Sequence, residues 1–202
     1  TPCQSSAASD VYKRQVAGHS LGEFSSLVAN NTISFEDGLK LVFLRAKAMQ
    51  KSCENSNGTM AAILGLDDKI IKETCESFDG NVTAANFNCP GQVVISGELN
   101  AVKMICEKFN DIGARRSILL PVGGAFHSNL MNDAKSELKE AIHKTKFNNP
   151  TCPIYQNFTA QKTTSIDIIK QNLINQLTAP VLWTQTINLS LIHISEPTRR
   201  LV

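Results

Sequence analysis

Five residues near the start of the chain, Gly18-His19-Ser20-Leu21-Gly22, fit the pattern G-x-S-x-G and restrict the fold more than any other segment. The pattern is typical of a sharp turn from a strand into a helix, which presents the serine hydroxyl at the helix N-terminus. Glycines allow the tight bend and close backbone approach that such a turn requires. Residues 16–17 and 24–29 fit a strand end and a helix on either side. The segment predicts an α/β fold, with Ser20 as a candidate nucleophile.

A serine hydroxyl attacks at neutral pH only when a base removes its proton. The candidate bases are His19, His127 and His143. His143 falls on the outer face of a predicted helix, and we expect His19, beside the nucleophile, to pack or to shape the pocket. His127 follows a predicted strand and a Gly-Gly turn, where a loop can deliver it to a sheet edge. Loop histidines are also commonly structural, so the pattern alone leaves the base open.

The middle of the chain alternates between strand and helix patterns in the order β-α-β-β-α-β. This order predicts a ferredoxin-like subdomain over residues 58–122. It divides an α/β core into two parts, residues 16–57 and 123–188, which we expect to form an incomplete, hydrolase-like parallel sheet. The predicted strands of the subdomain are 59–64, 81–87, 92–96 and 116–122, and its predicted helices are 67–78 and 99–112. Helical spacing predicts that the first helix places Ile70, Ile71 and Thr74 on one face. It predicts an inward stripe in the second helix of Val102, Ile105, Cys106 and Phe109.

A long amphipathic helix is predicted from residue 35 to about residue 53. Ser34, followed three residues later by Asp37, resembles a capping box. Apolar residues recur at helical spacing, and this pattern places Arg45 at the edge of the apolar stripe, where an arginine usually extends to solvent. The predicted stripe is Leu39, Val42, Phe43, Ala46 and Met49.

The last third predicts further elements of the α/β core. Two amphipathic helices are expected after Ser128 and from about residue 166, the second ending before Pro180. A short strand is expected at 151–155.

The two ends do not fit these patterns. Residues 1–15 and 189–202 resemble translated sequencing-adapter sequence, and we expect both segments to be non-native. The alternative is that they are natural, variable termini.

Composition excludes several classes of function. A net charge of +2 gives no indication of nucleic-acid binding, and no apolar run approaches the ~18 residues that span a bilayer. Six cysteines without a C-x-x-C pair give no zinc signature and fit a reducing, cytoplasmic location.

The longer motif around the serine and four later blocks resemble the malonyl-CoA:acyl carrier protein transacylases of fatty acid and polyketide synthesis. The resemblance covers about residues 16–188. The blocks are G-H-S-L-G-E at 18–23, R-A-K-A-M-Q at 45–50, N-F-N-C-P-G-Q-V-V-I-S-G at 86–97, P-V-G-G-A-F-H-S at 121–128 and Q-L-T-A-P-V-L-W-T at 176–184.

The resemblance assigns roles to individual residues. It implies that Ser20 is acylated, that His127 is the general base, and that Arg45 holds the free carboxylate of a malonyl group. A backbone carbonyl near the histidine, at the position of Gln176, would orient the ring. Two further assignments are Leu21, whose N–H would be half of an oxyanion hole, and Phe126, which goes with malonyl rather than methylmalonyl groups.

The resemblance also implies the substrates and partners. They are malonyl-CoA and acyl carrier protein, with no metal and no cofactor beyond the CoA thioester, and we expect a monomer that binds neither nucleic acid nor membrane. Acyl carrier proteins are acidic, so a basic rim would steer their encounter. The candidates for this rim are Lys40, Lys47, Lys51, Arg115 and Arg116.

Two alternatives stay open. The first is a serine hydrolase or thioesterase with the same turn. Such an enzyme has an acid between serine and histidine in sequence, but Asp67, Asp68 and Asp79 fall in the predicted subdomain, so a Ser20–His127 dyad is simpler. The second is an inactive gene fragment, because the family's G-Q-G-S-Q loop and G-P-G-K block have no match here.

Overall fold

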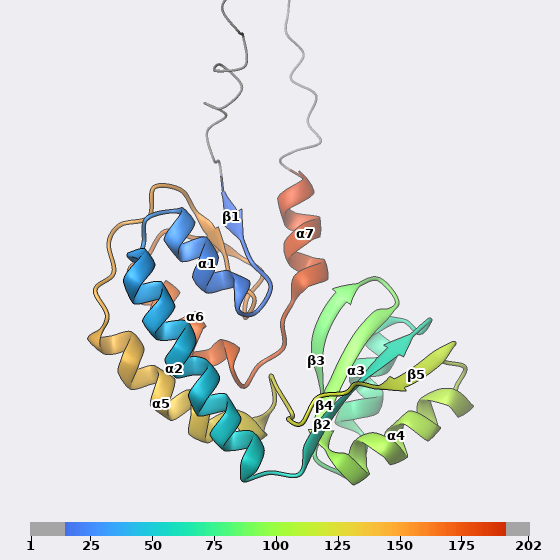
Figure 1. Cartoon of the computed structure of the whole chain (residues 1–202). Coiled ribbons are helices and arrows are strands. Elements are labelled where there is room, and N and C mark those ends of the chain that lie inside the picture. Colours follow the sequence, from blue (N-terminus) through green and yellow to red (C-terminus); the bar gives the residue numbers. More distant parts are fainter. Residues whose placement is uncertain (1–14, 193–202) are drawn as a thin grey trace, which may run out of the picture.

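The computed structural model describes residues 15–192 as an α/β fold with two sheets (Figure 1). The expected non-native ends lie almost entirely outside these residues. Residue 15 is the exception at one end, and residues 189–192 continue a helix at the other.

The first sheet is short and mixed, with the strand order β1-β6-β7. Strand β1 (Val16–Ala17) pairs in parallel with β6 (Ile154–Tyr155), and β6 pairs antiparallel with β7 (Lys162–Thr163). The prediction of a parallel sheet was therefore wrong at β7. The strand expected at 151–155 is also shorter, because only Ile154 and Tyr155 form ladder hydrogen bonds.

Helices pack around this sheet, and all of them except the last, at residues 183–192, contribute to one buried apolar cluster. Figure 1 shows them as a separate lobe from the second sheet. The turn Asn129–Met131 precedes α5, and α7 runs between the lobes. The helices are α1 (Gly22–Ala29), α2 (Phe35–Glu54), α5 (Asn132–Lys144), α6 (Ile166–Gln176) and α7 (Trp183–Ile192).

The bounds of α2 confirm the predicted helix, and Ser34 Oγ caps it by accepting a hydrogen bond from the Asp37 N–H. The predicted stripe was partly wrong: Val42 and Met49 pack against the apolar cluster of this lobe, but the other three residues are exposed. Leu39 and Phe43 are 60% and 65% exposed, and the helix instead buries Gly38, Leu41, Arg45, Ala48 and Ser52. Small residues let α2 lie close to its neighbours: a β-carbon on Gly38 would crowd Val28 of α1. Arg45 therefore lies on the inward face.

The second sheet is antiparallel and four-stranded, in the order β3-β4-β2-β5. Helices α3 and α4 share an apolar cluster with one of its faces, and the predicted inward residues of α4, Val102, Ile105, Cys106 and Phe109, are all buried. On α3 the expected stripe was partly wrong, since Ile70 is 44% exposed while Ile71 and Cys75 are buried. The strands are β2 (Gly58–Leu64), β3 (Val82–Cys89), β4 (Gln92–Glu98) and β5 (Arg116–Leu119), and the helices are α3 (Asp68–Glu76) and α4 (Leu99–Asp111).

The segment that precedes α7 joins the two lobes. Val181 forms an isolated parallel bridge with Asn86 of β3, through hydrogen bonds with Ala85 and Phe87. Among residues 15–192, no helix is both long and apolar enough to cross a membrane.

Candidate active site

Ser20 lies in the turn between β1 and α1 with a φ of 50°, a backbone conformation that is uncommon for residues other than glycine. The turn is tight enough that a β-carbon on Gly18 would overlap the carbonyl oxygen of Gly22. The side chain of Asn157, which follows β6, forms two hydrogen bonds to the backbone of this turn. Its Oδ1 accepts the Ser20 N–H at 2.5 Å, and its Nδ2 donates to the Gly18 carbonyl at 2.7 Å. The side chain of Asn157 therefore supports the strained residue on both sides.

The structure brings His127 to Ser20, although 107 residues separate them in sequence. His127 Nε2 lies 2.8 Å from Ser20 Oγ, and His127 Nδ1 lies 2.8 Å from the carbonyl oxygen of Gln176. A carbonyl can only accept, so Nδ1 carries the proton and Nε2 is free to accept the proton of the serine hydroxyl. The Gln176 carbonyl thus takes the place that a carboxylate occupies in a catalytic triad.

Burial lowers the pKa of His127 from 6.5 to about 4. The hydrogen bond to Gln176 opposes this change, and the charge of Arg45 reinforces it. The ring is only 4% exposed. His127 is therefore neutral at physiological pH, which is the form that can act as a base.

Arg45 reaches the same serine from α2. Its Nη2 donates to Ser20 Oγ at 2.9 Å, and its guanidinium lies 5.9 Å from the centre of the Phe24 ring. Burial lowers the pKa of Arg45 from 12.5 to about 10, which leaves it charged at neutral pH, and the nearby Glu23 carboxylate opposes the decrease. Its Nε is buried without a hydrogen-bond partner in the described part of the chain. Arg45 is therefore a buried, charged side chain with a hydrogen-bond donor still available, rather than a surface arginine.

A cavity of about 510 Å³ opens over Ser20, Arg45 and His127, between the two lobes. Helix α2 contributes Met49 and Cys53 to its wall, and Phe126 also lines it. The four-stranded second sheet contributes Met60, Asn86, Asn88 and Val94. Ser20, Arg45 and His127 thus line a pocket that residues of both lobes form.

The remaining predicted residues lie close to this pocket. Leu21 is 45% exposed, and its N–H has no acceptor among residues 15–192, so it is available to a ligand. His19 does not contact Ser20 Oγ; its Nε2 lies 2.9 Å from Asn88 Oδ1, and its ring packs edge-on against Trp183. His143 is exposed on α5.

Glu23 and Asn157 belong to the site, but the sequence assigned no role to either. Both are completely buried. Burial raises the pKa of Glu23, and hydrogen bonds from Asn157, Gln176 and Gln156 oppose that increase. Glu23 is part of the motif at 18–23, so the sequence did offer one indication of its role: an acidic residue next to a turn that is expected to be buried. Asn157 had no signal of its own.

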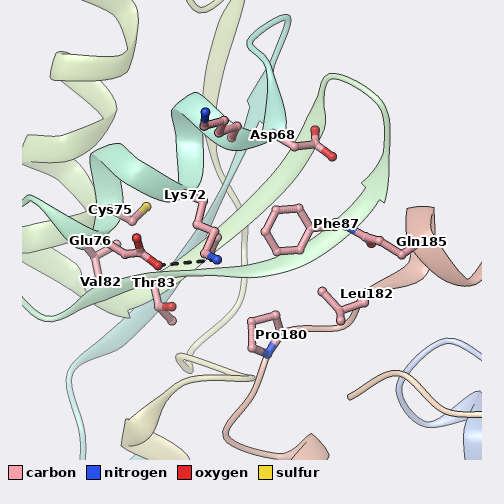
Figure 2. A pocket seen from close by; sticks show the side chains of 12 residues that line it. Asp68, Lys72, Cys75, Glu76, Val82, Thr83, Phe87, Pro180, Leu182 and Gln185 are labelled. Carbon is pink, nitrogen blue, oxygen red and sulfur yellow. Dashed lines mark ion pairs between the residues drawn. The ribbon is translucent and has the colours of Figure 1, made fainter. Parts of the chain in front are cut away.

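A second hollow of about 360 Å³ lies where α3 and β3 meet the segment 180–185 (Figure 2). Lys72, which lines this hollow, forms an ion pair with Glu76 at 3.8 Å. None of the predicted site residues line it. Among the described residues there is also no group of three or more His, Cys, Asp or Glu side chains that could hold a metal ion.

Comparison with known proteins is consistent with this site. Residues 6–196 match the acyl transferase domain family, and the chain belongs to that family. It is similar to the malonyl CoA-acyl carrier protein transacylases of Staphylococcus aureus strain MRSA252 (40% identical over 167 residues) and Escherichia coli strain K12 (42% over 174 residues). These alignments cover 81% and 85% of this chain but 54% and 56% of the relatives. The chain thus spans little more than half the length of the curated relatives it matches.

Solved structures give the same result. The acyl-carrier-protein S-malonyltransferase of Burkholderia pseudomallei 1710b matches with a TM-score of 0.88 and 37% identity, over 93% of this chain and 62% of that one. A malonyl-transacylase solved in complex with a type II polyketide synthase acyl-carrier protein matches with a TM-score of 0.85 and 36% identity, over 89% and 59%.

Proposed function

We propose that this chain carries the acyl-transfer site of an [acyl-carrier-protein] S-malonyltransferase. It would move a malonyl group from CoA to the phosphopantetheine thiol of acyl carrier protein, through an acyl-serine intermediate, in fatty acid biosynthesis. The single observation that carries the proposal is that Ser20 Oγ contacts both a neutral histidine, His127, and a buried cation, Arg45.

The proposed reaction has two matched halves. His127 Nε2 takes the proton of Ser20 as Oγ attacks the thioester carbonyl of malonyl-CoA, and the Leu21 N–H stabilises the resulting oxyanion. The C–S bond then breaks, and His127 gives its proton to the leaving CoA thiolate. The carrier-protein thiol attacks the malonyl-serine ester by the same route and regenerates free Ser20.

Arg45 supplies the selectivity in this proposal. A guanidinium binds a carboxylate through two parallel hydrogen bonds, and such charge-assisted bonds are stronger in a desolvated pocket. Because only Nη2 is hydrogen-bonded to Ser20, Arg45 retains donors for the free carboxylate of a malonyl group. Phe126 in the cavity wall would crowd an α-methyl group. The pocket chemistry therefore favours an unbranched diacid.

The proposal also covers partners, cofactors and location. Arg115, Arg116 and Lys47 are exposed, as a surface for an acidic carrier protein requires. Lys40 is also exposed but lies 4.0 Å from Asp37, and Lys51 is paired with Glu137 at 2.7 Å. The mechanism uses no metal and no cofactor beyond the CoA thioester. Five free cysteines among the described residues support a reducing, cytoplasmic setting.

We further propose a division into a hydrolase-like core, residues 16–57 and 123–188, and an inserted ferredoxin-like subdomain, residues 58–122. The sheet order β3-β4-β2-β5 and the separate apolar clusters of the two lobes support this division.

A serine hydrolase or thioesterase is the alternative. It would use the same Ser20 and His127. The contact of His127 Nδ1 with a carbonyl rather than a carboxylate, and the position of Arg45, favour the transferase.

The test is acylation of this chain by malonyl-CoA, followed by mass spectrometry of the intact protein and its peptides. One malonyl group is expected on Ser20, and Ser20→Ala is expected to abolish it. Ser25→Ala, which changes an exposed serine on α1, is the matched control and should be acylated normally. A folded chain that labels a cysteine and leaves Ser20 unmodified would exclude the assignment.

A further inference from the structure

Glu23 is a completely buried carboxylate that the proposed reaction does not use. It lies at the start of α1, three residues after Ser20. Its Oε1 accepts from Gln156 Nε2 at 2.9 Å, and its Oε2 accepts from the Asn157 N–H at 3.1 Å and from Gln176 Nε2 at 2.6 Å. None of the ion pairs within residues 15–192 includes it. Glu23 is therefore held entirely by neutral amides.

Two of these partners hold the reacting pair with their other atoms. The side chain of Asn157 binds the Ser20 N–H and the Gly18 carbonyl. Gln176 Nε2 also donates to the Ser20 carbonyl at 3.1 Å, while the Gln176 carbonyl accepts from His127 Nδ1. Glu23 is thus one contact away from both the nucleophile and the base.

The third partner extends the network into α6. Gln156 Oε1 accepts from Asn172 Nδ2 at 2.9 Å, and Gln156 Nε2 also donates to the Ile169 carbonyl at 3.1 Å. Because Gln176 is the last residue of α6, these contacts hold the end of that helix against the turn that carries Ser20.

The hydrogen bonds to Glu23 favour its ionised form and oppose the burial that raises its pKa. Every partner presents an N–H, so a carboxylate satisfies all of them, whereas a proton on Oε2 would face the Gln176 amide. The charge of Arg45 offsets part of the cost of burying this carboxylate, but no ion pair joins the two side chains among the described residues, and burial is the larger effect on the Glu23 pKa. Stability alone therefore does not account for an acid at this position.

We propose that Glu23 is a positioning residue, whose carboxylate aligns the amides of Asn157 and Gln176 and thereby holds Ser20 and the ring of His127 in reactive geometry. The inference rests on the proposed acyl transfer at Ser20. It adds a role for a residue that touches neither substrate nor the reacting atoms, since Glu23 does not line the cavity.

The test compares this chain with its Glu23→Gln variant by two measurements that do not depend on malonyl transfer. The first is the rate at which a fluorophosphonate, a small serine-directed reagent, modifies Ser20. The second is the ¹H–¹⁵N NMR signal of His127 Nδ1–H. Glutamine keeps the shape but turns one acceptor into a donor, so the rate should fall about 10- to 100-fold and the Nδ1–H signal should shift or disappear.

Two further variants complete the design. Ser96→Ala removes another buried polar group, which does not line the cavity and has no hydrogen bond to the network of Glu23, and should change neither measurement. Gln176→Met keeps the carbonyl that holds His127 but removes the amide that contacts both Glu23 and the Ser20 carbonyl, so it should reproduce the loss of rate.

The outcomes separate this inference from the proposed function. If malonyl-CoA is a substrate, Glu23→Gln should lower kcat and leave KM unchanged. If malonyl-CoA fails to acylate the wild-type chain but the fluorophosphonate rate still depends on Glu23, the positioning role stands and the proposed substrate is wrong. Wild-type rates and an unchanged Nδ1–H signal in folded Glu23→Gln, or a wild-type rate in Gln176→Met, would overturn the inference.

Discussion

Arg45 Nη2 donates a hydrogen bond to Ser20 Oγ at 2.9 Å, from a side chain that is only 5% exposed. The contact places a charged guanidinium directly at the atom that would carry the acyl group. It also means that the serine oxygen accepts from Arg45 while its own proton points to His127. Both acyl selectivity and nucleophile orientation can therefore be tested at Arg45.

Replacing Arg45 should change selectivity more than overall reactivity. Arg45→Ala is expected to reduce kcat/KM for malonyl-CoA about 10- to 100-fold, because hydrogen bonds to a charged group are worth about 1.5–3 kcal/mol. Acetyl-CoA has no free carboxylate, so its kcat/KM should change much less. Arg45→Lys should restore only part of the ratio, because an ammonium lacks the two-pronged geometry. Lys47→Ala, an exposed cation on the same helix, is the control. A malonyl-to-acetyl ratio that is equal in all four proteins would contradict the role.

Substitution by alanine should destabilise the chain at Gly18 but not at Gly22. A β-carbon on Gly18 would overlap the Gly22 carbonyl, and backbone atoms cannot move aside as a flexible side chain can. Gly18→Ala is therefore expected to lower the free energy of unfolding by about 1–3 kcal/mol and to abolish acylation of Ser20. Nothing lies within 4 Å of a β-carbon on Gly22, where alanine also favours the helix. Urea unfolding and acylation rates measure both effects, and equal behaviour of the two variants would refute the proposed tightness of the turn.

The stability of the chain should depend on pH through His127. Its pKa is 6.5 in the unfolded chain and about 4 in the folded one, so between these values the unfolded state binds a proton that the folded state does not. The free energy of unfolding should therefore fall as the pH is lowered from 6.5 towards 4. The expected loss is up to about 3 kcal/mol, at about 1.4 kcal/mol per pKa unit.

Urea unfolding of the wild type and His127→Gln over this pH range isolates the contribution of His127. Glu23, whose pKa is raised by burial, contributes the opposite slope, but it is present in both proteins. The difference in unfolding free energy between the two proteins should shrink as the pH falls. Parallel curves would show that His127 is not buried in the neutral form.

Cysteine reactivity should follow burial. Burial raises the pKa of Cys75 to about 12 and that of Cys106 to about 11, whereas Cys89 is exposed. In mildly alkaline buffer, iodoacetamide should alkylate Cys89 first, and Cys75 and Cys106 should react only after unfolding. Peptide mapping by mass spectrometry measures the order. Alkylation of Cys75 in the folded chain at the rate of Cys89 would contradict the packing of α3 against the second sheet.

Local features were predictable because neighbouring residues determine them. The cap of α2 at Ser34 depends on the Asp37 N–H three residues away, and the apolar spacing of α4 correctly identified its buried face. The motif at 18–23 predicted the turn that carries Ser20. Together with the resemblance to a known family, it also placed His127, Arg45 and Gln176 around one serine, where the structure brings them together.

What the sequence determined by itself was therefore the order of the elements and the identity of the groups that meet at Ser20. Only the tertiary structure decided which side of α2 is buried, because two faces of that helix have apolar or small residues at helical spacing, and packing against α1 and α5 selects one. The same holds for the support of the site. Asn157 lies 137 residues from Ser20 and 134 from Glu23, so no local pattern could reveal that its amide holds the turn. A buried polar network forms between segments that are distant in sequence, and its members become recognisable only when folding removes them from water and leaves them one another as partners.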